Sequence, residues 1–322
     1  MDIVIPLVLL AIGLVILIYG AEWLVRGASS AARKVGISPL VVGLTVVAFG
    51  TSAPELTVNL YSALTGTTDI AVGNIIGSNI ANILLILGVT AAIIPLTVKS
   101  TTVRWGIPLA LLAAVLVLVF GKDRLFGEGT IDVITRTDGL ILLAFFTVFM
   151  GYVFFLVHKD KEAAIPEEAK KEPLSIPFSL LLIIAGFSGL VIGGKMLVDQ
   201  AVILARLGGL SEAVIGLTIV AVGTSLPELA TSVVAAVKKE VDIAIGNVIG
   251  SNIFNVFFVL GLTSVVAPLP VPEGFSIDAS VGIAAVLLLL TALFIGSRGR
   301  LDRWQGIVFV LLYVSYLTYL VV

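Results

Sequence analysis

The sequence contains the same segment twice. Residues 43–88 recur as residues 216–261, without insertion or deletion, at a constant offset of 173 positions. The two copies are identical at 25 of 46 aligned positions, far more than unrelated apolar segments would share. The repeated positions include polar residues in very apolar surroundings, above all Glu55 and its counterpart Glu228. The fold must therefore be built from two related halves, each with a carboxylate that requires a structural or functional reason.

The apolar content of the chain identifies a membrane protein. Of its 322 residues, 59% are hydrophobic and only 12% are charged, which is far outside the range of soluble domains. Runs of about 20 apolar residues, the helical length that crosses the hydrocarbon layer, can be counted directly. They are continuously apolar rather than alternating, so we expect an all-α polytopic protein with ten transmembrane helices. The ten runs cover residues 3–25, 38–64, 70–96, 103–120, 139–157, 176–198, 213–237, 243–266, 277–295 and 304–322.

Positive charge is distributed unevenly over the loops between these runs. If the ten runs cross the membrane alternately, 14 of the 19 Lys and Arg residues fall on one side and 5 on the other. The richer side is predicted to be cytoplasmic, which places both termini of a cell-membrane protein outside the cytoplasm. Each half has five spans, an odd number, so the second half enters from the opposite side. The prediction is two inverted five-helix repeats, residues 1–157 and 176–322, joined by a polar cytoplasmic linker, residues 158–175.

Inverted repeats with polar, broken segments at matching places are typical of secondary transporters that bind their substrate near the midplane. In GTSAPE, residues 50–55, Pro54 removes a backbone donor and clashes with the preceding turn, so the second run is predicted to break. The break frees backbone carbonyls near Ala48 and starts a new helix at residues 52–55. GTSLPE, residues 223–228, predicts the same event in the second half. The expected ion-binding side chains at the two breaks are Thr51, Ser52, Glu55, Thr224, Ser225 and Glu228.

The runs that follow each break add further oxygen ligands. Ser78 and Asn82 are four positions apart and share a helix face, as do Ser251 and Asn255. A GxxxG pattern precedes each pair and would let its helix approach a neighbour closely, so that these side chains converge.

An oxygen-only site suits a hard cation. Ca²⁺ takes six to eight such ligands, whereas transition metals prefer His and Cys, of which the chain has one and none. Glu55 and Glu228 are the expected metal ligands because two carboxylates balance a divalent charge. Without the divalent ion, burial and mutual repulsion disfavour two ionised carboxylates, so protons or monovalent cations should replace it. This competition describes antiport.

These motifs resemble those of the calcium/cation antiporter superfamily, which includes sodium/calcium and proton/calcium exchangers. The resemblance rests on GTSAPE with GNIIGSNIAN in the first copy and GTSLPE with GNVIGSNIFN in the second. It implies a ten-helix exchanger fold of the sodium/calcium exchanger type. It also implies ion ligands at Thr51, Ser52, Glu55, Ser78, Asn82, Thr224, Ser225, Glu228 and Ser251, with backbone carbonyls from Ala48 and Ala221.

One departure from the superfamily pattern bears on the counter-ion. Sodium/calcium exchangers usually have Asp where this chain has Asn255, so its centre carries two acids rather than three. The GTSxPE pattern is nevertheless closer to the sodium-coupled branch than the GNAxE pattern of plant and fungal proton/calcium exchangers. We expect a secondary active antiporter that exports Ca²⁺ in exchange for H⁺ by alternating access at the paired glutamates. A Na⁺/Ca²⁺ exchanger is the alternative.

Functions of other classes are weighed against antiport. A cation channel could use the same oxygen-lined pathway, and conductance far above transporter turnover would favour it. A membrane sensor without transport is disfavoured because the linker is too short to fold into a soluble domain. An enzyme or ATP-driven pump is not expected, since no GxxxxGK[ST] motif occurs. We expect no cofactor, no nucleic acid and no obligate protein partner, only transported ions and the lipid bilayer.

Overall fold

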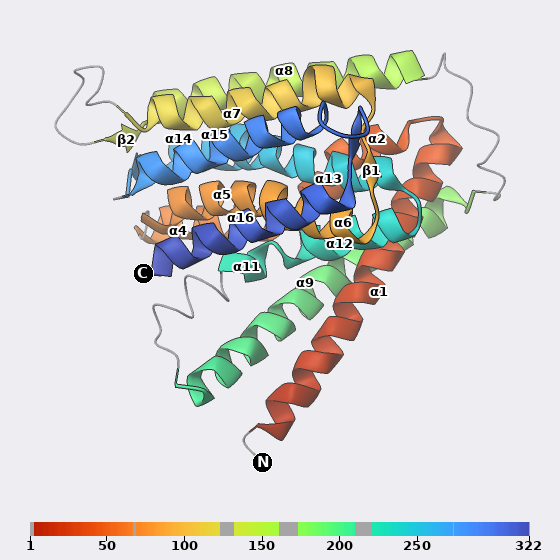
Figure 1. Ribbon diagram of the computed structural model, residues 1–322, viewed down its shortest axis with the longest axis horizontal. Coiled ribbons are helices and arrows are strands. Elements are labelled where there is room, and N and C mark those ends of the chain that lie inside the picture. Colours follow the sequence, from red (N-terminus) through yellow and green to blue (C-terminus); the bar gives the residue numbers. More distant parts are fainter. Residues whose placement is uncertain are drawn as a thin grey trace.

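Both halves of the chain fold mainly into helices (Figure 1). The computed structural model describes residues 3–66, 69–122, 132–160, 173–209, 221–272 and 274–321. Most of the predicted linker and residues 213–220 of the seventh apolar run lie outside the described residues. The first half contains α1 (Val4–Val35), α2 (Pro39–Val42), η1 (Gly43–Val47), α3 (Ala48–Thr51), α4 (Ala53–Thr65), α5 (Asp69–Ile80), η2 (Ala81–Leu87), α6 (Gly88–Ile93), β1 (Leu96–Thr97), η3 (Thr102–Gly106), α7 (Ile107–Phe120), β2 (Val133–Ile134) and α8 (Arg136–Asp160).

The described elements of the second half follow a similar order. It contains α9 (Ile176–Leu207), α11 (Ala221–Thr224), α12 (Leu226–Val237), α13 (Val241–Ile253), η6 (Phe254–Leu260), α14 (Gly261–Val266), β3 (Leu269–Pro270), α15 (Phe275–Ala292), β4 (Arg300–Leu301) and α16 (Arg303–Val321). Here η denotes a π-helical segment. The bounds of η2, α6 and β1 recur in η6, α14 and β3 at the 173-position offset seen in the sequence.

The number of membrane spans is defined by helix length and apolarity. Within the described residues, seven helical stretches are long and apolar enough to cross a membrane, and a bent pair adds an eighth. α1 and α9 continue about ten residues beyond the apolar runs at residues 3–25 and 176–198. Their charged ends, which include Arg33 and Arg206, stay helical because a basic last turn complements the helix dipole. The fold is therefore a polytopic helical bundle, and the count of ten spans stays a prediction.

The bent pair confirms the helix break predicted at GTSAPE. α2, η1 and α3 meet α4 at an angle of 44°, with Ser52 between them. Pro54 occupies the first turn of α4, where its missing N–H leaves no intrahelical bond unmade. The break lies inside the bundle, so the polar groups around it face protein rather than lipid.

α1 and α9 form an inclined pair, and the start of α1 and the end of α9 project from the rest of the bundle (Figure 1). Glycines at their contact let the two backbones meet: a Cβ built on Gly13 would lie 3.1 Å from the Gly193 carbonyl oxygen, and one built on Gly27 would lie 2.7 Å from the Ser179 carbonyl oxygen. Residue numbers rise along α1 as they fall along α9, so the two helices pack antiparallel. Close packing of small residues supplies the attraction that the hydrophobic effect does not supply between helices in lipid.

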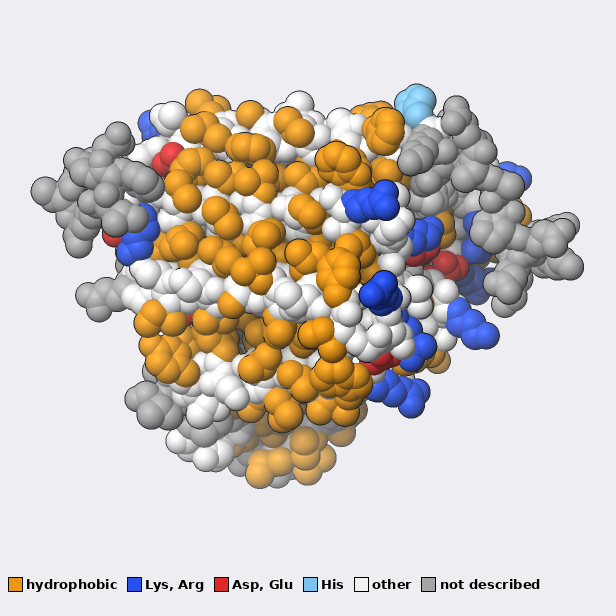
Figure 2. Space-filling model, turned by 45° about the horizontal axis from the view of Figure 1, so that its top comes forward, with side chains coloured by type: hydrophobic (Ala, Val, Ile, Leu, Met, Phe, Trp, Pro, Cys, Tyr) orange, Lys and Arg blue, Asp and Glu red, His pale blue; other side chains and the backbone are white. Residues whose placement is uncertain are grey.

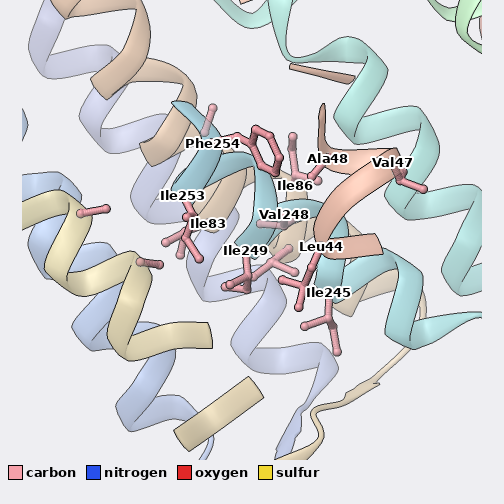
Figure 3. Close-up of a cluster of buried hydrophobic side chains, with 14 of the residues drawn as sticks. Leu44, Val47, Ala48, Ile83, Ile86, Ile245, Val248, Ile249, Ile253 and Phe254 are labelled. Atoms are coloured by element: carbon pink, nitrogen blue, oxygen red, sulfur yellow. The ribbon is translucent and has the colours of Figure 1, made fainter. Parts of the chain in front are cut away.

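The core of the remaining bundle is the crossing of η1, η2 and α13 (Figure 3). Leu44, Ile83 and Ile249 are buried there together with the other side chains of this cluster. Gly246 and Gly250 bring α13 against the first half, since Cβ atoms there would lie 2.8 and 2.7 Å from atoms of Leu40 and Ala48. The second GxxxG pattern thus makes the close contact expected of it. The first pattern does not, because a Cβ built on Gly73 or Gly77 would meet nothing within 4 Å among the described residues.

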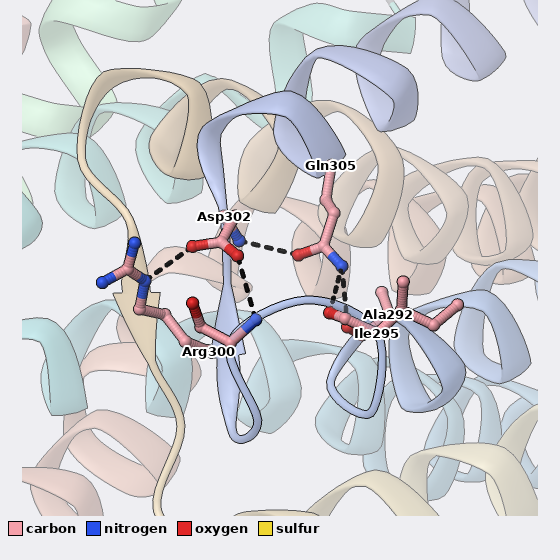
Figure 4. A network of polar contacts seen from close by, with 6 residues as sticks. Ala292, Ile295, Arg300, Asp302 and Gln305 are labelled. Carbon is pink, nitrogen blue, oxygen red and sulfur yellow. Dashed lines mark hydrogen bonds and ion pairs between the residues drawn. The ribbon is translucent and has the colours of Figure 1, made fainter.

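Two small sheets tie the halves together at their ends. β1 pairs antiparallel with β4, and β2 with β3, so each sheet takes one strand from each half. Beside β4, the Asp302 carboxylate accepts a hydrogen bond from Arg300, which holds the pKa of Asp302 below its usual value. Gln305 accepts from the Asp302 N–H and donates to the carbonyls of Ala292 and Ile295 (Figure 4). This network closes the end of α15 and starts α16.

Lys and Arg side chains gather along one edge of a broad apolar band (Figure 2). Among the described residues, two ion pairs join α1 to the second half. Arg33 lies 3.1 Å from Glu240 at the start of α13, and Glu22 lies 2.7 Å from Lys238 at the end of α12. The Ser29 hydroxyl also donates to Glu240. One end of α1 is therefore fastened to the second half of the chain by charge.

The glycine contact between α1 and α9 yields a stability prediction. In Gly20→Ala the new Cβ would lie 2.7 Å from the Leu190 backbone nitrogen, so the helices must separate, and we expect a loss of about 1–3 kcal/mol. Thermal unfolding in detergent measures this loss. Gly151→Ala is the matched control, because its Cβ meets nothing within 4 Å and alanine favours a helix. Equal melting temperatures for the two variants would contradict the proposed role of Gly20.

Candidate ion-binding site

Two buried glutamates occupy equivalent places at the breaks in the two halves. Glu55 lies in the first turn of α4 and Glu228 in the first turn of α12, and each side chain is about 1% exposed. The residues before these helices, Ser52 and Ser225, have nearly the same backbone angles, φ −82° and ψ 3° against φ −90° and ψ 4°. The second break, predicted at GTSLPE, is thereby confirmed. Each carboxylate sits at a helix N-terminus, where the helix dipole favours negative charge.

The polar groups of the two breaks reach across to the opposite half. The Ser52 hydroxyl donates to Oε1 of Glu228 over 3.4 Å. The Thr51 hydroxyl lies 3.5 Å from the Ser251 hydroxyl and donates to Oδ1 of Asn247 over 3.0 Å. The site predicted from two separate motifs is therefore one cluster, to which both halves contribute.

The helices after each break supply the rest of the cluster. Ser78, on α5, is buried. Asn82 and Asn255 are buried in the π-helical segments η2 and η6, where a wider turn interrupts the regular helix. Segments of this kind occur often at functional sites.

Several buried oxygens of this cluster meet no hydrogen-bond donor among the described residues. An unpaired buried acceptor costs about 1–3 kcal/mol, and more when it is charged, so a set of them in one place needs a compensating partner. The atoms named below are oxygens, the ligand type of hard cations, and the two carboxylates can also take protons. One amide nitrogen of α5, Asn74 Nδ2, is also buried without a partner in the described part of the chain. The unpaired oxygens are Glu55 Oε1 and Oε2, Ser78 Oγ, Asn82 Oδ1, Ser225 Oγ, Glu228 Oε2 and Asn255 Oδ1.

The structure differs from the sequence-based expectation at Ala48. Its carbonyl is not freed by the break, because it accepts the Ser52 N–H at 3.0 Å and the Thr51 hydroxyl at 3.3 Å. The helical bonds persist as far as Ser52, and the chain turns only after that residue. Ala221 begins α11 and Thr224 ends it, next to Ser225. These residues occupy the places in the second half that Ala48 and Thr51 occupy in the first.

The prediction from the sequence did not include three asparagines of the cluster. Asn247 accepts from Thr51 and donates to the Ser232 hydroxyl, 3.0 Å away, and to the Glu228 carbonyl, 3.4 Å away. Asn79 and Asn252 hydrogen-bond with Asn255 and Asn82. All three belong to the repeated GN and GSN motifs, so their identity in both copies was a signal available from the sequence.

Carboxylates in the described part of the chain do not gather beyond this pair. No group of three or more His, Cys, Asp or Glu side chains within it could hold a metal ion. A cation here would be coordinated by two carboxylates and by neutral oxygens.

Comparison with known proteins gives a consistent family relationship. Residues 5–155 and 178–322 match the model of the family described as sodium/calcium exchanger protein. The chain is 39% identical over 311 residues to the putative antiporter CaxA of Alkalimonas amylolytica, covering 95% of each protein. It is 33% identical over 341 residues to the sodium/calcium exchanger MaX1 of Methanosarcina acetivorans, covering 97% of each.

A solved structure has the same fold over the full length. The chain superposes on the sodium-calcium exchanger NCX_Mj with a TM-score of 0.81 and 35% sequence identity, covering 98% of this chain and 99% of that one. The relationship therefore includes both halves and the elements that carry the glutamates.

The contacts of Asn247 predict a stability role for this residue. Asn247→Leu keeps the size of the side chain but leaves Thr51, Ser232 and the Glu228 carbonyl without this partner, so we expect a loss of about 2 kcal/mol in thermal unfolding. Thr45→Val serves as control, because among the described residues the Thr45 hydroxyl bonds only to the Val41 carbonyl, four positions earlier in the chain. It should change stability by less than about 0.5 kcal/mol. A similar loss in both variants would show that Asn247 has no special role.

Proposed function

The chain belongs to the sodium/calcium exchanger protein family, whose members are membrane transporters, and we propose that it exports Ca²⁺ in exchange for H⁺. The observation that carries this proposal is the pair of buried glutamates at equivalent breaks, with the Ser52 hydroxyl of one half bonded to the Glu228 carboxylate of the other. Unpaired neutral oxygens complete a cation-binding centre.

The proposed chemistry is competition for the same carboxylates. With Ca²⁺ bound, Glu55 and Glu228 are ionised and balance its charge, which allows the site to close off from water. With Ca²⁺ released, two buried carboxylates repel each other and lack solvent, so protonation compensates them. Only a charge-compensated site can change its access from one side of the membrane to the other at low free-energy cost. This requirement couples the Ca²⁺ flux to the H⁺ flux.

The choice of H⁺ as counter-ion is supported by the number of acids. Two carboxylates at the centre can exchange one divalent ion for two protons, and position 255 carries the neutral Asn rather than a third acid. The similarity to MaX1 and NCX_Mj, both named sodium/calcium exchangers, favours Na⁺ as the alternative counter-ion.

We further propose that the halves, residues 1–157 and 176–322, are inverted five-span repeats on either side of a cytoplasmic linker, residues 158–175. The antiparallel packing of α1 on α9, which are equivalent elements, supports the inversion. Two inverted halves exchange conformations to open the site first to one side and then to the other. The excess of Lys and Arg on one side supports a cell-membrane orientation with both termini outside the cytoplasm.

Flux in proteoliposomes tests the function and the counter-ion. Vesicles loaded with acidic buffer and diluted into neutral medium should accumulate Ca²⁺ as protons leave. Vesicles loaded with Na⁺ at equal internal and external pH should accumulate little. Uptake driven only by the Na⁺ gradient would identify Na⁺, rather than H⁺, as the counter-ion. If neither gradient drives uptake, coupled exchange is refuted. Ca²⁺ flux that ignores both gradients and far exceeds transporter turnover would indicate a channel.

Neutralising either glutamate tests the site itself. Glu55→Gln and Glu228→Gln keep the size of each side chain but leave one carboxylate to balance a divalent ion, so we expect Ca²⁺ uptake to fall by at least about a hundredfold. Thermal unfolding should show that both variants stay folded, since removing a buried charge relieves desolvation. Glu22→Gln, which removes a half-exposed carboxylate at the Lys238 ion pair, is the matched control and should transport normally. Normal transport by Glu55→Gln would remove that residue from the site.

A further inference from the structure

Four buried or nearly buried asparagines meet where the two halves cross at the centre of the bundle. Asn79 and Asn82 come from the end of α5 and the start of η2, and Asn252 and Asn255 come from the equivalent places in α13 and η6. We name these four residues the asparagine ring. Sequence offset relates Asn79 to Asn252 and Asn82 to Asn255, so the ring has the symmetry of the repeat.

Each half donates two hydrogen bonds to the other half, and the two sets are equivalent under the repeat. The Asn79 amide nitrogen donates to the Asn252 backbone carbonyl, and the Asn252 amide nitrogen donates to the Asn79 carbonyl, both over 3.2 Å. The Asn82 amide nitrogen donates to Oδ1 of Asn252 over 2.9 Å, and that of Asn255 donates to Oδ1 of Asn79 over 3.1 Å.

The two backbone carbonyls fix the direction of every amide in the ring. A carbonyl can only accept, so Asn79 and Asn252 must turn their nitrogen atoms toward the carbonyls and their oxygen atoms the other way. Those oxygens in turn accept only from the nitrogen atoms of Asn255 and Asn82. Flipping any one amide would set two acceptors or two donors against each other, which a buried network does not tolerate.

The outcome is that Asn82 and Asn255 direct their oxygen atoms away from the ring. Both Oδ1 atoms are buried and meet no donor among the described residues. Asn82 lies four positions after Ser78, whose buried hydroxyl also has no partner among the described residues, so the two side chains lie one turn apart. We infer that Asn79 and Asn252 are positioning residues, which lock Asn255 and Asn82 so that these two amides offer the ion site their oxygen atoms and not their N–H groups.

This role deepens the proposed function and rests on it. An amide free to rotate would present N–H groups to the two carboxylates and would neutralise them by hydrogen bonding in place of a cation. The locked amides instead add neutral oxygen ligands of the kind that Ca²⁺ accepts. The ring therefore favours cation binding without adding charge to the site.

A double-mutant cycle tests the inference, because a residue that acts through another has no effect once that other is gone. The measured quantities are the KM for Ca²⁺ uptake in proteoliposomes and the affinity of purified protein for Ca²⁺ by calorimetry. Asn252→Ala and Asn82→Ala should each raise the KM about tenfold and lower the Ca²⁺ affinity about tenfold. The double variant should be weakened no further than Asn82→Ala alone. Asn255 donates to Asn79 rather than to Asn252. The variant that combines Asn252→Ala with Asn255→Ala should therefore show the product of the two single-variant changes in KM.

Controls separate orientation from simple packing. Gln305→Ala removes another buried amide that holds two backbone carbonyls, far along the chain from the site, and should lower the melting temperature without changing KM. Asn252→Asp provides a second variant if Asn252→Ala does not fold. Its protonated carboxyl can donate to the Asn79 carbonyl and accept from Asn82, so it should retain most of the affinity.

The outcomes distinguish this inference from the function on which it rests. Unchanged KM in folded Asn252→Ala, or effects that multiply in the Asn82 and Asn252 double variant, would overturn the positioning role while Ca²⁺ transport by the unsubstituted protein upholds the function. An unsubstituted protein that neither binds nor transports Ca²⁺ would overturn both.

Discussion

The constraint on which the structure depends is that polar atoms at membrane depth must find their partners inside the protein. Glu55 and Glu228 are nearly fully buried, and only one of their four carboxylate oxygens, Oε1 of Glu228, has a hydrogen-bond partner among the described residues. Burying acceptors in this way is unfavourable unless a cation or proton completes the site. The helix breaks, the π-helical segments and the close helix contacts all serve to gather these oxygens at one place. The stability of the centre is thereby linked to what it binds.

Duplication gives the centre its symmetry, but the ends of the molecule do not keep it. The asparagine ring and the two breaks repeat at an offset of 173 positions, whereas the ion pairs that fasten α1 do not. Thr67 and Thr65 stand where the repeat would need counterparts of Glu240 and Lys238. Among the described residues, the ion pairs between α1 and the second half are those of Glu22 and Arg33. If the halves exchange conformations as we propose, the two states would have equal energy in a symmetric protein, and these ion pairs would favour the state in which they are formed.

The sequence was most informative where a single residue has a strong local effect. Pro54 and Pro227 predicted both breaks because proline disrupts any helix that contains it beyond the first turn, and the glutamates stood out against apolar surroundings. The contacts of Asn79, Asn247 and Asn252 could not be predicted in this way. Their roles depend on which backbone carbonyl lies opposite once two distant helices cross. The engaged carbonyl of Ala48 has a similar origin, since the turn closes at Ser52 rather than before it.

The ring also explains why the identity of residue 255 and the charge of the site cannot vary independently. Asn255 must donate to Oδ1 of Asn79, which lies 3.1 Å from its nitrogen. An ionised Asp at this position would place two acceptors against each other, and relief would require Asn79 to turn. Turning Asn79 would withdraw its N–H from the Asn252 carbonyl and leave that carbonyl unpaired. A third ionised carboxylate at the centre is thus disfavoured by the ring as it stands, whereas a protonated Asp at this position could still donate to Oδ1 of Asn79.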